Sequence, residues 1–163
     1  MKTYKKILVA VDLEGGSETV MARASELTAE YTDHIATEHH TTETKVIILN
    51  VGHYPMPTYA GVYGEGLYSA QELSVDFSAI RARLIPQIEQ LVEKSELVGA
   101  ECVVEFGRPA DLILELAERE GVDLIILGSH GKHGIRLLLG STANSVLHHA
   151  DCDVLAVRIE KKA

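Results

Sequence analysis

Cysteine, tryptophan and proline are scarce in this sequence. Its 163 residues include two cysteines, four prolines and no tryptophan. Cys102 and Cys152 lie in or beside apolar runs, and neither belongs to a CxxC motif or to a Cys/His set with the spacing of metal ligands. This excludes a disulfide framework and a zinc site built on cysteine. We expect both cysteines to be reduced and to pack against the core.

Basic residues are also few in comparison with acidic ones. There are 15 Lys and Arg against 24 Asp and Glu, so the formal net charge is −9. Long-range electrostatics would repel a nucleic-acid backbone, and we therefore expect no nucleic-acid binding. A small anion held by main-chain N–H groups stays compatible with this charge, because such a local field acts only at short range.

Long apolar runs are absent as well. No window approaches the roughly 18 apolar residues of a membrane span. The basic start MKTYKK leads only into a short apolar run that ends in an acid, which is not the pattern of a targeting segment. The sequence therefore predicts no membrane insertion and a cytoplasmic protein.

Short β-branched runs alternate with longer amphipathic stretches along the chain. The length and the 46% hydrophobic content fit one domain, residues 1–163. Continuous apolar runs, which are typical of buried parallel strands, occur at residues 7–11, 46–51, 102–106, 124–127 and 154–159. Five strands are therefore predicted.

Apolar residues spaced by three and four positions predict four helices between these strands. The first follows Ser17 as its N-cap, and the second carries a stripe over residues 73–91 with a kink at Pro86. The third begins at Pro109 and reaches about Glu120. The fourth covers residues 141–149, with Ser141 as its cap.

This alternation implies an α/β fold with an open, doubly wound parallel sheet covered by helices on both faces. In such sheets a ligand binds beyond the carboxyl ends of the strands, at the point where the strand order reverses. The loops that follow the strands are therefore where a functional site is expected.

Two segments interrupt the alternation. Residues 32–44 are polar and rich in histidine, and we expect an exposed insertion there. A metal site at its histidines is the alternative, but no flanking cysteine or acid pattern supports one. Residues 53–69 contain four tyrosines and follow the second strand. They predict either a lid over the carboxyl edge or a surface loop that packs on the second helix or on a partner.

The stretch LGSHGKHGIRLLLGSTAN, residues 127–144, joins the fourth strand to the fourth helix. Glycine at Gly128 and Gly131 lets main-chain N–H groups approach an anion closely. At Gly140, Ser141 and Thr142 the chain enters the helix, where free N–H groups and hydroxyls favour phosphate. The composition indicates a polyphosphate site, and a loop that only turns the chain is the alternative.

Other phosphate and hydrolase motifs do not match. A P-loop requires GxxxxGK followed by Ser or Thr, but Gly131-Lys132 is followed by His133 and is preceded five positions earlier by Ile126. The first strand is followed by DLEGGSE, which is not the GxGxxG of a dinucleotide site. GxSxG is absent, so a nucleophile elbow is not predicted.

Several stretches resemble the universal stress protein family and together span nearly the whole chain. They are KKILVAVD, LNV, GRPA, DLIILGSHG and LGSTANSVLHHADCDVLAV. The nucleotide-binding branch of that family carries Gly-x2-Gly-x9-Gly followed by Ser or Thr. Here Gly128, Gly131 and Gly140-Ser141 follow the same order with eight residues in the second gap, one fewer than in the family.

The resemblance implies an open five-stranded sheet of order 3-2-1-4-5 that binds ATP, with Mg²⁺, at its carboxyl edge. It assigns Asp12 as an acceptor of hydrogen bonds from the ligand and Val51 as the residue whose main chain meets the adenine. The residues expected around the ribose and phosphates are Gly128, Ser129, Gly131, Gly140, Ser141 and Thr142. Asp12 capping the following turn, and Val51 serving only as core, are the alternatives from the residues themselves. No catalytic residue and no protein-held metal site are predicted.

The family resemblance also implies a homodimer, or a dimer of dimers, formed through the last strand at residues 153–159. That strand is apolar and would lie at an edge of the sheet. Cys102 and Cys152 would lie near opposite edges, too far apart for a disulfide. The main functional hypothesis is an ATP-dependent sensor or regulator in stress response. A slow ATPase or autophosphorylating protein and a nucleotide-free interaction module are the alternatives.

Overall fold

The computed structural model describes residues 4–37, 44–52, 76–129 and 139–159, with the backbone alone for residues 31–37. Strands and helices alternate over these residues. In chain order they are β1 (Lys6–Val11), α1 (Ser17–Thr37), β2 (Lys45–Gly52), α2 (Phe77–Lys94), β3 (Glu101–Phe106), α3 (Pro109–Glu120), β4 (Leu124–Gly128), α4 (Ser141–His149) and β5 (Asp153–Val157). Among the described helices, none has the length and low charge that a membrane span needs.

The strands form one parallel sheet in the order β3-β2-β1-β4-β5. The predicted fold class and strand order are therefore confirmed. Because β1 lies in the centre, the order reverses between β1 and β4, and the loops that follow these two strands diverge. The carboxyl edge at this position is where such folds bind ligands.

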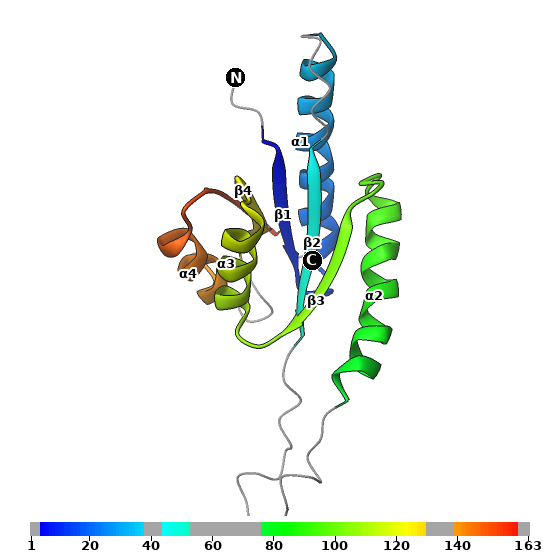
Figure 1. Ribbon diagram of the computed structural model, residues 1–163, viewed down its shortest axis with the longest axis vertical. Helices are drawn as coiled ribbons and strands as arrows, with labels where there is room; N and C mark the ends of the chain where they lie inside the picture. Colours follow the sequence, from blue (N-terminus) through cyan, green and yellow to red (C-terminus); the bar gives the residue numbers. More distant parts are fainter. Residues whose placement is uncertain (1–3, 38–43, 53–75, 130–138, 160–163) are drawn as a thin grey trace, which may run out of the picture.

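Helices cover both faces of the sheet. Figure 1 shows α1 and α2 on one side and α3 and α4 on the other. The first face is packed by Val20, Met21 and Ile88 from the helices, together with alternate strand residues such as Val9. The second face is packed mainly by α3 and α4 on the strand residues that point the other way. The central strands are apolar in sequence because both of their faces are buried.

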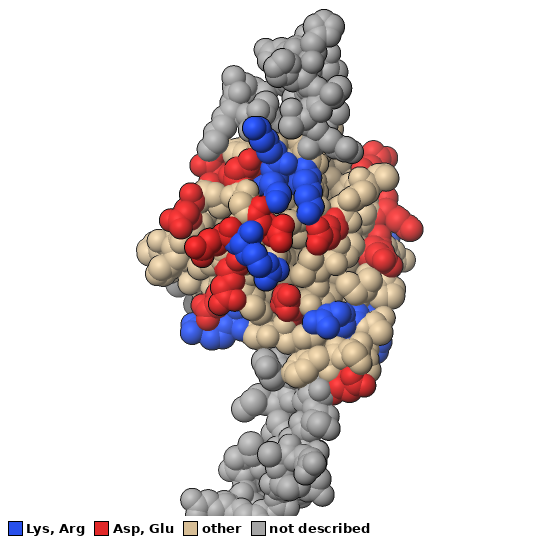
Figure 2. All heavy atoms as spheres, viewed as in Figure 1, with Lys and Arg blue, Asp and Glu red and all other residues tan. Residues whose placement is uncertain are grey.

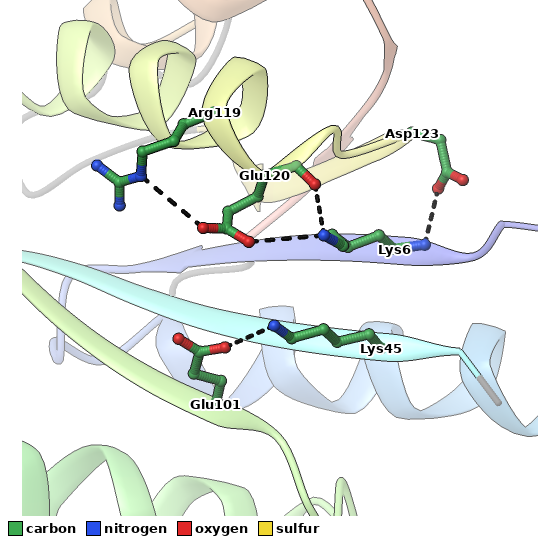
Figure 3. A network of polar contacts seen from close by, with 6 residues as sticks. All are labelled: Lys6, Lys45, Glu101, Arg119, Glu120 and Asp123. Carbon is green, nitrogen blue, oxygen red and sulfur yellow. Dashed lines mark hydrogen bonds and ion pairs between the residues drawn. The ribbon is translucent and has the colours of Figure 1, made fainter.

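The amino ends of the strands are connected by charged side chains, drawn in Figure 3. The Asp123 carboxylate accepts hydrogen bonds from the main-chain N–H groups of Lys5 and Lys6, at 2.9 and 3.2 Å. The Lys6 ammonium donates to the Glu120 carbonyl and lies 3.5 Å from the Glu120 carboxylate. The start of β1 is therefore fixed to the connection between α3 and β4.

A second pair links two strands at the same end. Lys45 of β2 lies 2.8 Å from Glu101 of β3, and both side chains are about half exposed. The hydrogen bond with Glu101 raises the pKa of Lys45. Figure 2 shows that acidic and basic side chains alternate over the face viewed there. That face has no extended area of one sign.

Two predicted boundaries are wrong. The first helix continues to Thr37, so residues 32–37 of the predicted insertion are helical. The reason is visible in the sequence, because Ile35 continues the apolar spacing of four from Tyr31. The last strand ends at Val157 and not at residue 159. The second helix begins at Phe77, after its cap Asp76. Leu73, the first residue of the predicted stripe, lies outside the described residues.

Neither cysteine forms a disulfide, and both are partly buried, as predicted. Cys102 lies in β3 and packs at the margin of the first core, while Cys152 precedes β5 and packs at the margin of the second. They are therefore near opposite edges and on opposite faces of the sheet. Burial raises the pKa of the Cys102 thiol, with a smaller contribution from Glu89, which favours the neutral form.

Candidate functional site

The ends of β1, β2 and β4 bring predicted site residues to one edge of the sheet. Ala10 of β1 is in register with Leu127 of β4, so Asp12 and Ser129 each follow two positions later. On the other side Val11 is in register with Asn50, so Asp12 follows next to the level of Val51. The sequence-predicted positions in β1, β2 and β4 therefore meet at the carboxyl edge.

Asp12 organises the turn between β1 and α1. Its Oδ1 accepts a hydrogen bond from the main-chain N–H of Glu14 at 2.9 Å and another from the hydroxyl of Ser17 at 3.0 Å. Ser17 is buried and is the first residue of α1, so the prediction that it serves as the N-cap is wrong. Its hydroxyl is directed to Asp12 instead.

The turn is also conformationally demanding. Leu13 has a φ of 59°, in the left-handed region that side chains with a Cβ rarely adopt. Both of these hydrogen bonds use Oδ1, and within the described part of the chain no hydrogen bond reaches Oδ2. The carboxylate therefore caps the turn through one oxygen, which is compatible with either sequence interpretation of Asp12.

Main-chain hydrogen bonds close the base of the glycine-containing loop. The N–H of Ser129 donates to the carbonyl of Val157 at 2.8 Å, which extends the pairing of β4 with β5 by one residue. The N–H of Gly140 then donates to the carbonyl of Ser129 at 2.7 Å. The end of β4 and the start of α4 are therefore held next to each other.

The N-terminus of α4 has no side-chain cap. Gly140 is the N-cap residue and its φ and ψ are −61° and 153°, so Ser141 is the first helical residue and not the cap as predicted. In contrast, Asp76 caps α2 by accepting from the N–H groups of Ser78 and Ala79. Hydrogen bonds from Ser78 and Ala79 lower the pKa of Asp76. Within the described ranges, no side chain caps the first turn of α4 in this way, and helix N-termini of this kind favour anions.

The predicted contact residues differ in exposure. Ser141 is exposed and Thr142 is half-buried, so both hydroxyl-bearing residues lie near the surface at the start of α4. Ser129 is buried, and Val51 and Gly128 are half-buried. Gly131, and the segment at residues 53–69 for which a lid or a surface loop was predicted, lie outside the described residues.

Sequence reasoning missed two polar residues that support this edge. Asn50 is buried in β2, and its side-chain N–H donates to the carbonyl of Val11 at 2.9 Å, directly before Asp12. Its signal was a single amide in the apolar run VIILNV. Ser17 was noticed only as a helix start, although it stands five positions after Asp12, within reach of a turn. Asn50 therefore fixes the main chain directly before Asp12, and Ser17 fixes the Asp12 carboxylate.

Comparison with known proteins gives a consistent relationship over almost the whole chain. Residues 3–158 match the universal stress protein family. Universal stress protein A homolog 2 of Coxiella burnetii is 37% identical over 162 residues, which cover 98% of this chain and 99% of the relative.

Solved structures of the same family share the fold. A universal stress protein in complex with cAMP aligns with a TM-score of 0.62 and 21% identity, over 96% of this chain and 98% of that one. The universal stress protein of Archaeoglobus fulgidus in complex with dAMP aligns with a TM-score of 0.53 and 21% identity, over 98% and 100%. From the family match and from the identity to the relative across nearly its full length, the chain belongs to the universal stress protein family.

Proposed function

We propose that this protein binds an adenine nucleotide at the carboxyl edge of its sheet, with ATP as its ligand. The observation that carries the proposal is the 2.7 Å hydrogen bond from Gly140 N–H to the Ser129 carbonyl. It places the uncapped N-terminus of α4 beside the end of β4, across the strand-order reversal from Asp12. Anionic phosphate and a hydrogen-bonding nucleoside then have matching groups at one edge.

The phosphates would lie at the start of α4. The N–H groups of its first turn and the hydroxyls of Ser141 and Thr142 supply donors there, and Gly131 belongs to the same proposed set. Gly128 and Ser129 would border the ribose. Asp12 would accept from the nucleoside through Oδ2, because Oδ1 is already used by Glu14 and Ser17. Val51 would present its main chain to the adenine.

Magnesium would be held mainly by the ATP phosphates. Among the described residues there is no group of three or more His, Cys, Asp or Glu side chains that fits a metal ion. The hydroxyls and main-chain N–H groups at the start of α4 suit the phosphates, and the magnesium ion would arrive with the nucleotide and keep several of its waters. The solved relatives in complex with cAMP and dAMP support an adenine nucleotide as the ligand class.

Isothermal titration calorimetry tests the proposal most directly. Purified protein is titrated with ATP and MgCl₂, and then with AMP, cAMP and GTP. We expect saturable binding of one adenine nucleotide per chain and much weaker binding of GTP. Absence of heat with every adenine nucleotide, together with no rise in the unfolding temperature when ATP is added, would contradict the proposal.

Two substitutions at one residue then test the observation that carries it. Gly140→Pro keeps the observed φ but removes the N–H that donates to Ser129, whereas Gly140→Ala keeps the N–H. We expect Gly140→Pro to weaken ATP binding about tenfold more than Gly140→Ala, since a hydrogen bond at the base of the site is lost. Equal affinities for the two variants would show that the hydrogen bond between Gly140 and Ser129 does not contribute to ATP binding.

We propose a role in nucleotide-dependent regulation, in which the occupied state is read by a partner, without strong catalysis. Asp12, the described acid at this edge, is assigned here to the nucleoside, and the two histidines that could act as a base, His130 and His133, lie outside the described residues. Measurement of phosphate release at saturating ATP separates this role from a slow ATPase. Release well above the buffer background, or transfer of label from ATP to the protein, would favour the enzymatic alternative.

We also propose a homodimer, or a dimer of dimers, that pairs through β5. The two edge strands, β3 and β5, differ in the side chains at their edges. On β3, the main-chain carbonyl of Val104 accepts a hydrogen bond from Arg81 of α2, at 3.2 Å. β3 also carries Glu101 and Glu105, which disfavour edge pairing. β5 reads DVLAV, and β4 is its one neighbour in the sheet over the residues that the structure describes. An open apolar edge of this kind suits a two-fold contact.

Sedimentation velocity at several concentrations tests this assembly. We expect a dimer or tetramer for the wild type and a shift to monomer for Ala156→Lys in β5. Glu105→Lys places the same charge on the opposite edge strand and should leave the assembly unchanged. A wild-type monomer at all concentrations would rule out the proposed dimer.

A further inference from the structure

Two glycines at the border of the proposed site face the same side chain. Gly16 directly precedes α1, and Gly128 is the last residue of β4. A Cβ added at Gly16 would lie 2.4 Å from Cδ1 of Ile159, 3.0 Å from its Cγ2 and 3.1 Å from its Cγ1. A Cβ at Gly128 would lie 2.6 Å from the same Cδ1. These distances are far inside van der Waals contact between carbon atoms.

The backbone at these positions does not itself require glycine. The positive-φ glycines of the described chain are Gly99, Gly107 and Gly121, so Gly16 and Gly128 adopt conformations that other residues accept. A side chain added at either position would meet Ile159, which would then have to shift. Its side chain packs at the margin of the first core, two positions beyond the end of β5.

We infer that Ile159 is a positioning residue of the nucleotide site, whose side chain fills the space between Gly16 and Gly128 and so fixes the turn at Asp12 against the end of β4. The inference rests on the proposed function. Sequence reasoning assigned glycine at position 128 to close approach of a ligand. The contact with Ile159 gives that glycine a packing reason in addition.

The two segments that Ile159 separates carry different parts of the proposed site. On one side, Asp12 and Ser17 form the turn that ends at Gly16. On the other side, Gly128 leads through Ser129 to Gly140 and the start of α4. A nucleotide that contacts both the Asp12 turn and the start of α4 requires a fixed distance between these two segments. A smaller side chain at position 159 would leave the separation unsupported, while an added Cβ at either glycine would force it wider.

A double-mutant cycle between positions 16 and 159 tests this, with Gly15→Ala as a matched control. Gly15 is the adjacent residue, and a Cβ built there has no atom within 4 Å. We measure the ATP affinity and the unfolding midpoint of Gly16→Ala, Ile159→Ala and the double variant. We expect about a tenfold loss of affinity for each single variant and no further loss in the double variant, because the added methyl then occupies vacated space. Gly15→Ala should bind as the wild type does.

A second cycle with Gly128→Ala separates packing from ligand approach. If Gly128 serves Ile159, Gly128→Ala weakens binding in the wild-type background and has little effect in the Ile159→Ala background. An equal loss in both backgrounds would show that Gly128 acts through the ligand alone, without Ile159, and would overturn the inference. A lowered midpoint with wild-type affinity for Ile159→Ala would also overturn it, because Ile159 would then be core only. If the wild type binds no nucleotide, the proposed function fails first and the positioning role fails with it, whereas the midpoints still report whether the two positions pack together.

Discussion

The amino and carboxyl ends of the sheet are built differently. At the amino end, the charged side chains of Lys6, Glu120 and Asp123 form hydrogen bonds and ion pairs with one another and with main-chain groups. At the carboxyl end, Asp12 uses one carboxylate oxygen for its own turn, and the start of α4 has no side-chain cap. Among the described residues, the first end has these donors and acceptors paired within the chain, and the second is where we propose that the nucleotide binds.

This difference separates stability from binding within one fold. Loops beyond the carboxyl ends are where parallel sheets place their ligands, so groups left without internal partners are expected there. Left-handed backbone occurs at both ends, at Leu13 beside Asp12 and at Glu96 where α2 leads into β3. Substitutions at the amino end should therefore change the free energy of unfolding, and substitutions at the carboxyl end should change ligand affinity.

The largest effect is expected for Asp123→Ala at the amino end. Its carboxylate accepts from the N–H groups of Lys5 and Lys6, and removing it leaves both donors at the start of β1 without that acceptor. We expect the free energy of unfolding to fall by about 2 kcal/mol, measured by urea denaturation, with ATP affinity unchanged. Asp151→Ala, at another exposed acid on the amino side of β5, is the control and should change neither quantity. A drop in ATP affinity without loss of stability would contradict the proposal that the amino end serves stability and the carboxyl end serves binding.

Asp12→Asn tests the carboxyl end with the opposite pattern. The amide keeps an acceptor for Glu14 and Ser17 but replaces the second oxygen by a donor. We expect ATP affinity to fall about tenfold, or about 1.4 kcal/mol, while the unfolding midpoint stays close to that of the wild type. Asp12→Ala should lose the affinity and also part of the stability, because the turn then loses its acceptor. Wild-type affinity for Asp12→Asn would move the nucleoside contact to another residue.

Glu96→Gly should stabilise the amino side of the molecule. Glu96 is exposed and has a φ of 59°, which glycine adopts without a steric penalty. We expect the free energy of unfolding to rise by about 0.5 to 1 kcal/mol, with no change in ATP affinity. Gln90→Gly, at an exposed position inside α2, is the control and should destabilise by about 1 kcal/mol. A change in the free energy of unfolding with the same sign for both variants would show that the left-handed backbone at Glu96 is not the cause.

Lys45→Met should have the smallest effect of the series. Its pair with Glu101 is about half exposed, so solvent and salt screen the attraction. We expect no resolvable change in the urea midpoint, and no difference between low and high salt. Because the pKa of Lys45 is raised, any contribution is fully present below the pKa of the unfolded chain and is lost only in strongly alkaline solution. A salt-dependent midpoint near neutral pH would show that this pair matters more than its exposure indicates.

The sequence predicted the sheet well because its signals are local. Continuous apolar runs located all five strands, and Pro109 located the start of α3. The strand order came from the family resemblance. The boundaries that failed depend on weaker signals, such as the polar stretch in which Ile35 continues the helical stripe. Helix propensity in such a stretch is decided by neighbours distant in sequence.

The candidate site was predictable as a set of positions but not as a set of contacts. Glycines and hydroxyls near the carboxyl edge are visible in the sequence. That the Ser17 hydroxyl binds Asp12, that Asn50 supports Val11, and that Ile159 occupies the space beside Gly128 all depend on pairs joined only by folding. No spacing rule connects Ile159 to Gly16, which lie 143 positions apart (159 − 16).

The hydrogen bond between Gly140 and Ser129 has a consequence for loop length. The chain between them contains ten residues, one fewer than the family spacing gives. For a loop treated as a free chain, the entropy of closure changes with the logarithm of its length, so one residue alters it by only about 0.1 kcal/mol. Since the base is joined by main-chain groups, the geometry at the two anchor points does not depend on the intervening length. Insertions and deletions between these anchors should therefore be nearly neutral for folding, which leaves this loop free to diverge in length among relatives.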